Sequence, residues 1–195
     1  AVGHYCESYD FYITEAAADL AAGGTGIIEY RQKPCPAGTY NDLTARTGIT
    51  DCKTCTAGKA CEREALSDPA TFPDCAAGYF CLSGATSRYP DQTGSTSGPC
   101  PAGHYCIEGT SVPEPCPEGT WSNQERATSL DYCMPCPPGY LCTGTGNTWM
   151  TSNCPKGTYC EDGINTTGCT VANGITGMYC PLGTQFELFC PMGFY

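Results

Sequence analysis

The chain has 195 residues, a formal net charge of −11 and 18 cysteines, while Leu, Ile, Val and Phe together supply only 24 residues. So few large apolar residues cannot build the core of one globular domain of this length, and the cysteine content is typical of a disulfide scaffold from an oxidising compartment. The acidic charge argues against a nucleic-acid partner, and no stretch is apolar enough to insert into a membrane. We therefore expect a secreted or cell-surface protein.

Both ends of the chain fall within a motif. Residues Ala1 to Cys6 match the end of Cys100-Pro-Ala-Gly-His-Tyr-Cys106 without its opening cysteine, and Cys190 to Tyr195 stop one residue before the closing cysteine would follow. We interpret the chain as a segment of a longer polypeptide, with a processed polymer-forming subunit as the alternative.

Residues 7–34 form the longest interval without cysteine. Thr14 precedes an alanine-rich stretch that ends at Gly23-Gly24, which predicts a short capped helix. Ile27 to Arg31 predicts a strand. We expect a small insertion packed on its neighbouring repeat, or else a contact between copies made by Ile27, Ile28 and Tyr30.

An internal duplication follows. The four cysteines from Cys35 to Cys61 recur without a gap 81 residues later, from Cys116 to Cys142. Each copy leaves sixteen residues between its first two cysteines, two between the next two and five between the last two. The duplication indicates a repeated structural unit and divides the chain into residues 1–34, 35–115 and 116–195.

A shorter motif, Cys-x-x-Gly-x-aromatic-Cys, recurs throughout the chain. Its proline sets φ, its glycine supplies the positive φ of a tight turn, and its aromatic residue covers the sulfur atoms. We expect an elongated, disulfide-rich tandem array of short β-ribbon and turn modules. The copies run from Cys75 to Cys81, Cys100 to Cys106, Cys136 to Cys142 and Cys154 to Cys160, with a degenerate copy from Cys55 to Cys61.

Two Cys-x-x-Cys pairs, Cys52 with Cys55 and Cys133 with Cys136, have the spacing of redox or zinc sites. No helical pattern follows either pair, and a zinc site would leave the other cysteines unexplained. We expect structural disulfides in which the two members of each pair bond to different partners, with Cys35–Cys52 and Cys116–Cys133 as the most local bridges. All 18 cysteines should be bridged apart from any left unpaired by truncation.

No residue pattern predicts catalysis, a cofactor or a metal. The two histidines, His4 and His104, occupy the same place in two copies of Gly-His-Tyr-Cys, so we interpret them as repeat positions. Asn165-Thr166-Thr167 is an N-glycosylation sequon, and the hydroxyl-rich stretch from Ser83 to Pro99 is a candidate carrier of O-linked sugar.

The long duplicated motif, C-P-x-G-T-[Y/W] followed by Cys-x-x-Cys and Gly-x-x-Cys, resembles the ephrin-receptor-like cysteine-rich repeat, which is related in style to tumour-necrosis-factor-receptor and EGF-like modules. Versions rich in CPAGTY and CPxGxYC are typical of large protist surface proteins and flagellar-hair (mastigoneme) glycoproteins. By analogy with receptor modules that cross-pair, the resemblance implies four further bridges, Cys55–Cys75, Cys61–Cys81, Cys136–Cys154 and Cys142–Cys160.

The expected function is structural: a segment of an extracellular glycoprotein that builds or decorates a filament, flagellar hair or cell coat. Its expected partners are copies of itself, adjoining repeats or other extracellular glycoproteins. Modules without cores are stabilised by stacking on a neighbour, which predicts end-to-end assembly. The alternative is the ectodomain of a receptor or adhesin that binds a protein or sugar ligand.

Overall fold

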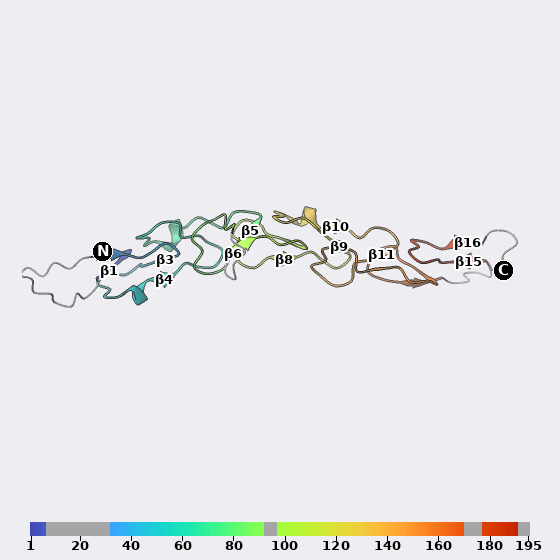
Figure 1. The fold of residues 1–195 in the computed structure, drawn as a ribbon, viewed down its shortest axis with the longest axis horizontal. Coiled ribbons are helices and arrows are strands. Elements are labelled where there is room, and N and C mark those ends of the chain that lie inside the picture. Colours follow the sequence, from blue (N-terminus) through green and yellow to red (C-terminus); the bar gives the residue numbers. More distant parts are fainter. Residues whose placement is uncertain (7–31, 92–96, 170–176, 191–195) are drawn as a thin grey trace, which may run out of the picture.

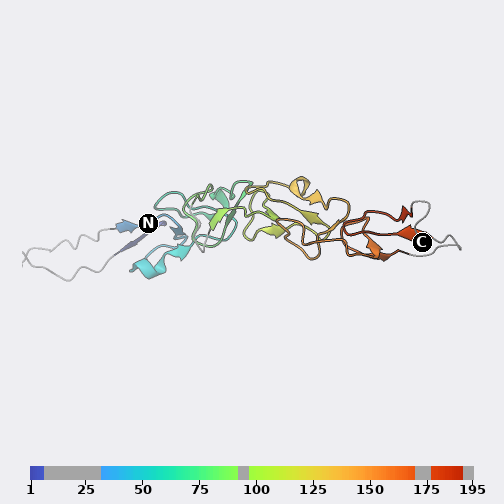
Figure 2. The same cartoon turned by 45° about the vertical axis from the view of Figure 1, so that its right-hand side comes forward.

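The structure is a computed structural model that describes residues 1–6, 32–91, 97–169 and 177–190. These residues form an elongated rod, with β1 (His4–Cys6) near one end and β15 (Met178–Tyr179) and β16 (Leu188–Phe189) near the other (Figure 1). A second view shows the same slender outline (Figure 2). The rod contains many short antiparallel ribbons and eight disulfides, which confirms the expected fold class.

Every named strand is two or three residues long and pairs only with its neighbour in the sequence. The antiparallel pairs are β1 with β2 (Gln32–Pro34), β3 (Thr39–Tyr40) with β4 (Lys53–Thr54), β5 (Tyr79–Cys81) with β6 (Ser97–Pro99), β7 (His104–Tyr105) with β8 (Glu114–Pro115), β9 (Thr120–Trp121) with β10 (Met134–Pro135), β11 (Tyr140–Leu141) with β12 (Ser152–Asn153), β13 (Thr158–Tyr159) with β14 (Thr167–Gly168), and β15 with β16.

An isolated bridge between Lys59 and Asp74 forms one more ribbon, so the described residues contain nine ribbons in sequence. We call each ribbon with its preceding turn a module. Modules 1 to 9 comprise residues 1–34, 35–54, 55–74, 75–99, 100–115, 116–135, 136–153, 154–168 and 169–189. The duplicated units at 35–115 and 116–195 thus begin with modules 2 and 6, and the interval without cysteine joins the two strands of module 1.

A tight turn begins each of modules 2 to 8. In module 5 the N–H of His104 donates to the carbonyl of Pro101 at 3.2 Å, and Gly103 between them has φ +79°. A type II turn requires a positive φ at this third position, which glycine adopts without strain. We call this residue the turn glycine, the cysteine three residues before it the opening cysteine, and the residue three after it the closing position. In module 9, where a longer interval follows the opening cysteine, these are Gly177, Cys169 and Cys180.

Four backbone hydrogen bonds join a module to the next. The N–H of the later opening cysteine donates to the carbonyl of the earlier turn glycine, whose own N–H donates to the carbonyl of the later closing position. The N–H of a loop residue in the later module donates to the carbonyl of the earlier opening cysteine. The carbonyl of the residue after that loop residue accepts from the N–H of the earlier closing position. Between modules 3 and 4 these bonds are Cys75 to Gly58, Gly58 to Cys81, Gly84 to Cys55 and Cys61 to Ala85, at 2.7–2.9 Å.

This four-bond ladder recurs at 2.7–3.1 Å between modules 2 and 3, 3 and 4, 4 and 5, 5 and 6, 6 and 7, and 8 and 9. It changes between modules 7 and 8, where Cys142 donates to the carbonyl of Gly163 and Cys154 donates to that of Gly139. Sequence analysis did not predict the ladder, since backbone groups make all of it. It converts a string of hairpins into one rod.

The turn glycines also contact the module after next. A Cβ placed on Gly103 of module 5 would lie 2.3 Å from the carbonyl oxygen of Gly146 in module 7, and one on Gly139 would lie 2.1 Å from that of Gly183 in module 9. No side chain fits at such distances. Gly103 and Gly139 are therefore each required twice, by a positive φ and by the backbone packed against them, whereas Gly157 has nothing within 4 Å of an added Cβ.

The core of the rod is made of cysteine. The largest fully buried side chains are those of Asn41 and eleven cysteines, and apolar clusters form around the disulfides, such as Phe72 with Cys55 and Cys61. Three 3-10 helices, η1 (Ile49–Asp51), η2 (Pro69–Thr71) and η3 (Leu130–Tyr132), lie in the loops, with η1 and η3 at matching places of the duplication. No helix in the described part of the chain is both long and apolar enough to cross a bilayer.

Candidate functional site

Eight disulfides hold the modules. Cys35–Cys52 and Cys116–Cys133, each spanning 17 residues, are the two local bridges expected from the sequence. The other bridges are Cys55–Cys61, Cys75–Cys81, Cys100–Cys106, Cys136–Cys142, Cys154–Cys160 and Cys169–Cys180. Cys6 and Cys190 are free.

The four cross-paired bridges implied by the receptor resemblance, Cys55–Cys75, Cys61–Cys81, Cys136–Cys154 and Cys142–Cys160, are wrong. The turn glycine reverses the chain so that the opening cysteine faces its own closing position, with Cα atoms 5.9 Å apart in Cys75–Cys81. This separation is typical of an unstrained disulfide. Each of modules 2 to 9 therefore closes on itself, and hydrogen bonds rather than disulfides connect successive modules.

Two modules lack a closing cysteine, and a buried polar residue takes its place. Asn41 and Ser122 occupy the closing positions of modules 2 and 6, and both are fully buried. The Asn41 amide donates to the carbonyl of His4 at 2.9 Å, and its Oδ1 accepts from the N–H of Leu43 at 3.1 Å. The opening cysteines of these modules bond instead to Cys52 and Cys133.

The Cys-x-x-Cys pairs are structural, as expected. Cys52 bonds to Cys35 while Cys55 bonds to Cys61, so the pair straddles the boundary between two modules. The two histidines also share one role. Nδ1 of His4 lies 3.0 Å from the carbonyl oxygen of Val2, and Nδ1 of His104 lies 3.2 Å from that of Ala102.

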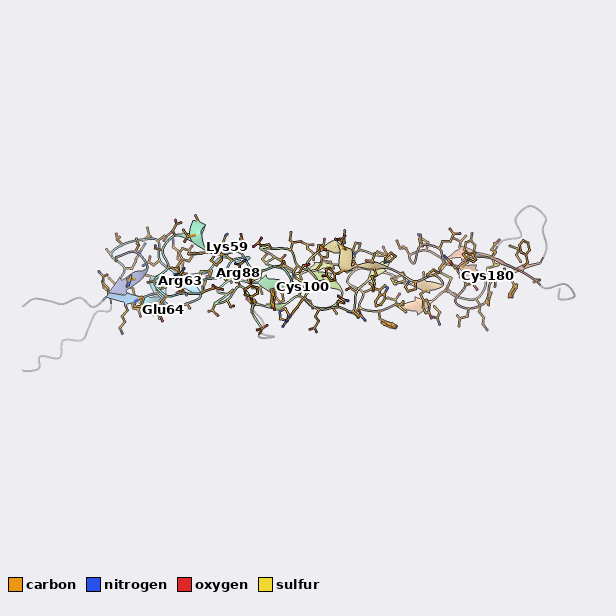
Figure 3. The ribbon with its side chains drawn as sticks, turned by 90° about the horizontal axis from the view of Figure 1, so that it is seen from above. Lys59, Arg63, Glu64, Arg88, Cys100 and Cys180 are labelled. Atoms are coloured by element: carbon orange, nitrogen blue, oxygen red, sulfur yellow. A yellow bond between two sulfur atoms is a disulfide. The ribbon has the colours of Figure 1, made fainter. Side chains whose placement is uncertain are left out.

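Two arginine side chains link different modules. The guanidinium of Arg126 in module 6 lies 3.1 Å from the Asp91 carboxylate and 5.2 Å from the ring centre of Tyr79, both in module 4. Arg88 of module 4 pairs with Glu108 of module 5 at 3.2 Å. Figure 3 shows Arg88 and Cys100 following each other along the rod, with Cys180 near the far end.

The glycosylation sequon lies on an exposed turn of module 8. The carboxylate of Asp162 accepts hydrogen bonds from the N–H groups of Asn165 and Ile164 and from the Asn165 side-chain amide, at 2.8–2.9 Å. These bonds, that from the Asn165 N–H first, lower the pKa of Asp162 to about 2. Ile164 is only half-exposed, while the Asn165 side chain points to solvent.

Module 9 exposes more apolar surface than its length would suggest. Large apolar side chains on both of its strands and on the loop between them are accessible, with exposed fractions of 41% for Tyr179, 56% for Leu182 and Phe186, 37% for Leu188 and 72% for Phe189. Tyr179 pairs with Leu188 across the ribbon. Apolar groups gathered on one element indicate a contact surface.

The described residues contain no group of three or more His, Cys, Asp or Glu side chains placed to hold a metal ion. One shallow, open hollow lies at the loop of module 5, lined by Ile107, Val112 and Glu114 among others. Its walls come from a single loop, and it brings no acid and base together.

Some sequence-based predictions fall outside the described residues. The expected helix after Thr14, the strand from Ile27 to Arg31 and the candidate self-contact of Ile27, Ile28 and Tyr30 all do so. The hydroxyl-rich stretch from Ser83 to Pro99 is described except at residues 92–96.

A scan against protein-family models and a search of curated proteins found no match to the chain. The candidate functional features are therefore those of the rod itself: its ladder, its exposed turn at Asn165 and its apolar module 9.

Proposed function

We propose that the chain is a structural segment of an extracellular glycoprotein, acting as a stiff spacer in a filament, flagellar hair or cell coat. The observation that carries this proposal is the ladder, which recurs at six junctions between successive modules, together with the contacts that the turn glycines of modules 1 to 7 make with the module after next. An array of this kind extends along one axis and suits a spacer better than an enclosed substrate site. The eight disulfides indicate an oxidising, extracellular or secreted setting.

The ladder supports stacking on further modules of the same type. The N–H of Cys190 donates to the carbonyl of Gly177, which is the bond that begins each junction within the rod. End-to-end association, with adjoining repeats or with other copies, would use backbone N–H and carbonyl groups. It would therefore depend little on which side chains the modules carry. Variation in loop residues would then leave assembly intact.

Asn165 is the proposed carrier of an N-linked glycan. Its side chain is exposed, and the amide nitrogen keeps one hydrogen after glycosylation, so the bond to Asp162 at 2.9 Å can persist. A glycan here would project from the rod without touching the ladder. Mass spectrometry of the native protein should find the Asn165 peptide glycosylated, and a wholly unmodified peptide would contradict this assignment.

Immunoelectron microscopy of the source cells would test the structural role. Antibodies raised against the purified rod should decorate an extracellular filament, hair or continuous coat. Labelling confined to the cell interior would refute the proposal.

The exposed apolar surface of module 9 favours one second candidate, a receptor or adhesin ectodomain. Scattered labelling of isolated sites on the plasma membrane would support that alternative over the filament.

A further inference from the structure

The second strand of module 9 departs from every other module. In modules 1 to 8 the two residues before the next opening cysteine are mostly polar residues, glycine or proline, whereas module 9 has two large apolar residues there, Leu188 and Phe189. The eight other pairs are Lys33-Pro34, Lys53-Thr54, Pro73-Asp74, Gly98-Pro99, Glu114-Pro115, Met134-Pro135, Ser152-Asn153 and Thr167-Gly168. The fold of a module therefore does not require this apolar pair.

Stacking does not require it either. The residue just before the next opening cysteine is exposed in seven of modules 1 to 8, although another module follows each of them, and the exception, Pro99, is only half-buried. A further module after Cys190 would by this pattern leave Phe189 accessible. The exposure of Phe189 is thus the exposure that this position has along the rod.

The charge of the chain indicates what covers this surface. Residues 1–126 carry eight basic and 16 acidic residues, a net charge of −8, whereas residues 127–195 carry one basic and four acidic residues, a net charge of −3. Two copies of the chain repel each other less through the second segment, where most of the exposed large apolar side chains also lie. The apolar surface of module 9 holds one charged residue, Glu187.

We propose that two copies of this chain associate through the second strand of module 9. Leu188 and Phe189 lie on opposite faces of the ribbon and would flank the same strand of the other copy. Such a contact is isologous, the commonest symmetry of homo-oligomers. Phe186 and Leu182, both 56% exposed, would lie at its margin. The contact is small and therefore reversible, and it does not depend on the proposed filament role.

Analytical ultracentrifugation of the oxidised rod over a range of concentrations tests the proposal. The wild type should show a concentration-dependent monomer–dimer equilibrium. The double variant Leu188→Ser, Phe189→Asn copies Ser152-Asn153, which already occupies these positions in module 7. It should weaken dimerisation by at least about tenfold, because apolar anchors dominate small interfaces.

The matched control is Ile49→Ser with Leu130→Ser, which removes apolar side chains of similar exposure, 56% and 50%, from other modules. This control should dimerise like the wild type. A wild type that stays monomeric at every concentration would overturn the proposal and would assign the surface to a different kind of partner. A Leu188/Phe189 variant that folds with intact disulfides and still dimerises would overturn it as well.

Discussion

Modules 2 to 6 and modules 7 to 9 share one backbone plan but differ in their side chains. Five ion pairs lie between Asp42 and Arg126, including the link from Arg126 to Asp91 two modules away. Only one basic residue, Lys156, follows Arg126 in the sequence. Both regions expose large apolar side chains, which in modules 7 to 9 include Tyr140, Trp149 and those of module 9.

The comparison distinguishes the interactions that stabilise the rod from the side chains that form its surface. The ladder and the disulfides occur in both regions, whereas all five of these ion pairs lie in modules 2 to 6, so ion pairs are not needed to build a module. Side chains that take no part in the disulfides or the turns can therefore differ between modules. In modules 2 to 6, two of the five ion pairs link different modules, while the second strand of module 9 exposes Leu188 and Phe189.

The largest expected effect comes from a methyl group on a turn glycine. Gly103→Ala should destabilise the rod by about 3–4 kcal/mol, because it adds the cost of a positive φ to a clash with the Gly146 carbonyl. Gly157→Ala has a similar φ but no atom within 4 Å of the added Cβ, so it should cost about 1–2 kcal/mol.

Denaturant unfolding of both variants, followed by circular dichroism, measures this difference. The gap between them isolates the contact between modules two apart from the conformational cost that they share. Equal destabilisation of the two variants would show that modules two apart do not pack as described.

Removing a disulfide should have the next largest effect, and the length of the closed loop should set its size. Replacing Cys35 and Cys52 by serine opens a bridge that spans 17 residues and should cost about 3 kcal/mol. Replacing Cys100 and Cys106 opens one that spans six residues and should cost about 2 kcal/mol. Thermal unfolding of the two double variants compares these costs, and the reverse order would contradict the loop-length explanation.

The sequence predicted the architecture well because cysteine, proline and glycine determine it locally. The tandem ribbons and the bridges Cys35–Cys52 and Cys116–Cys133 follow from motif and spacing. The cross-paired bridges were wrong because they were carried over from receptor modules. A signal against them was present in the sequence, since the extra cysteines Cys52 and Cys133 occur in the two modules whose closing positions are Asn41 and Ser122.

The remaining features were less accessible to sequence analysis. The ladder consists of backbone groups that every residue carries, so composition does not reveal which module pairs with which. The burial of Asn41 depends on the carbonyl of His4, a residue 37 positions away. The surface of module 9 becomes evident only when its second strand is aligned with the eight others.

A smaller effect is expected from the ion pairs that distinguish modules 2 to 6. Asp91→Asn removes the partner of Arg126, and because both side chains are largely exposed the cost should be at most about 1 kcal/mol. High salt should have the same effect on the wild type and should spare modules 7 to 9. Hydrogen exchange resolved by module would detect it, and a uniform response along the rod would contradict the comparison.

The smallest effect concerns the turn at Asn165. Hydrogen bonds lower the pKa of Asp162 from 3.8 to about 2, so the folded turn favours the ionised carboxylate. This contribution is fully present above pH 3.8 and is lost as the pH falls through about 2. NMR shifts of the Asn165 amide should therefore stay constant down to about pH 3 and move below it. Movement centred near pH 4 would show that the turn does not form as described.

Disulfide mapping tests most directly the central claim that each of modules 2 to 9 closes on itself. Tryptic cleavage without reduction should release residues 64–88, with Cys75 and Cys81, as a single peptide lighter by two hydrogens than its reduced form. Residues 54–59 and 60–63 should emerge joined through Cys55 and Cys61. Recovery of peptide 64–88 linked to either of these two peptides would show that disulfides cross between modules, and would contradict the account.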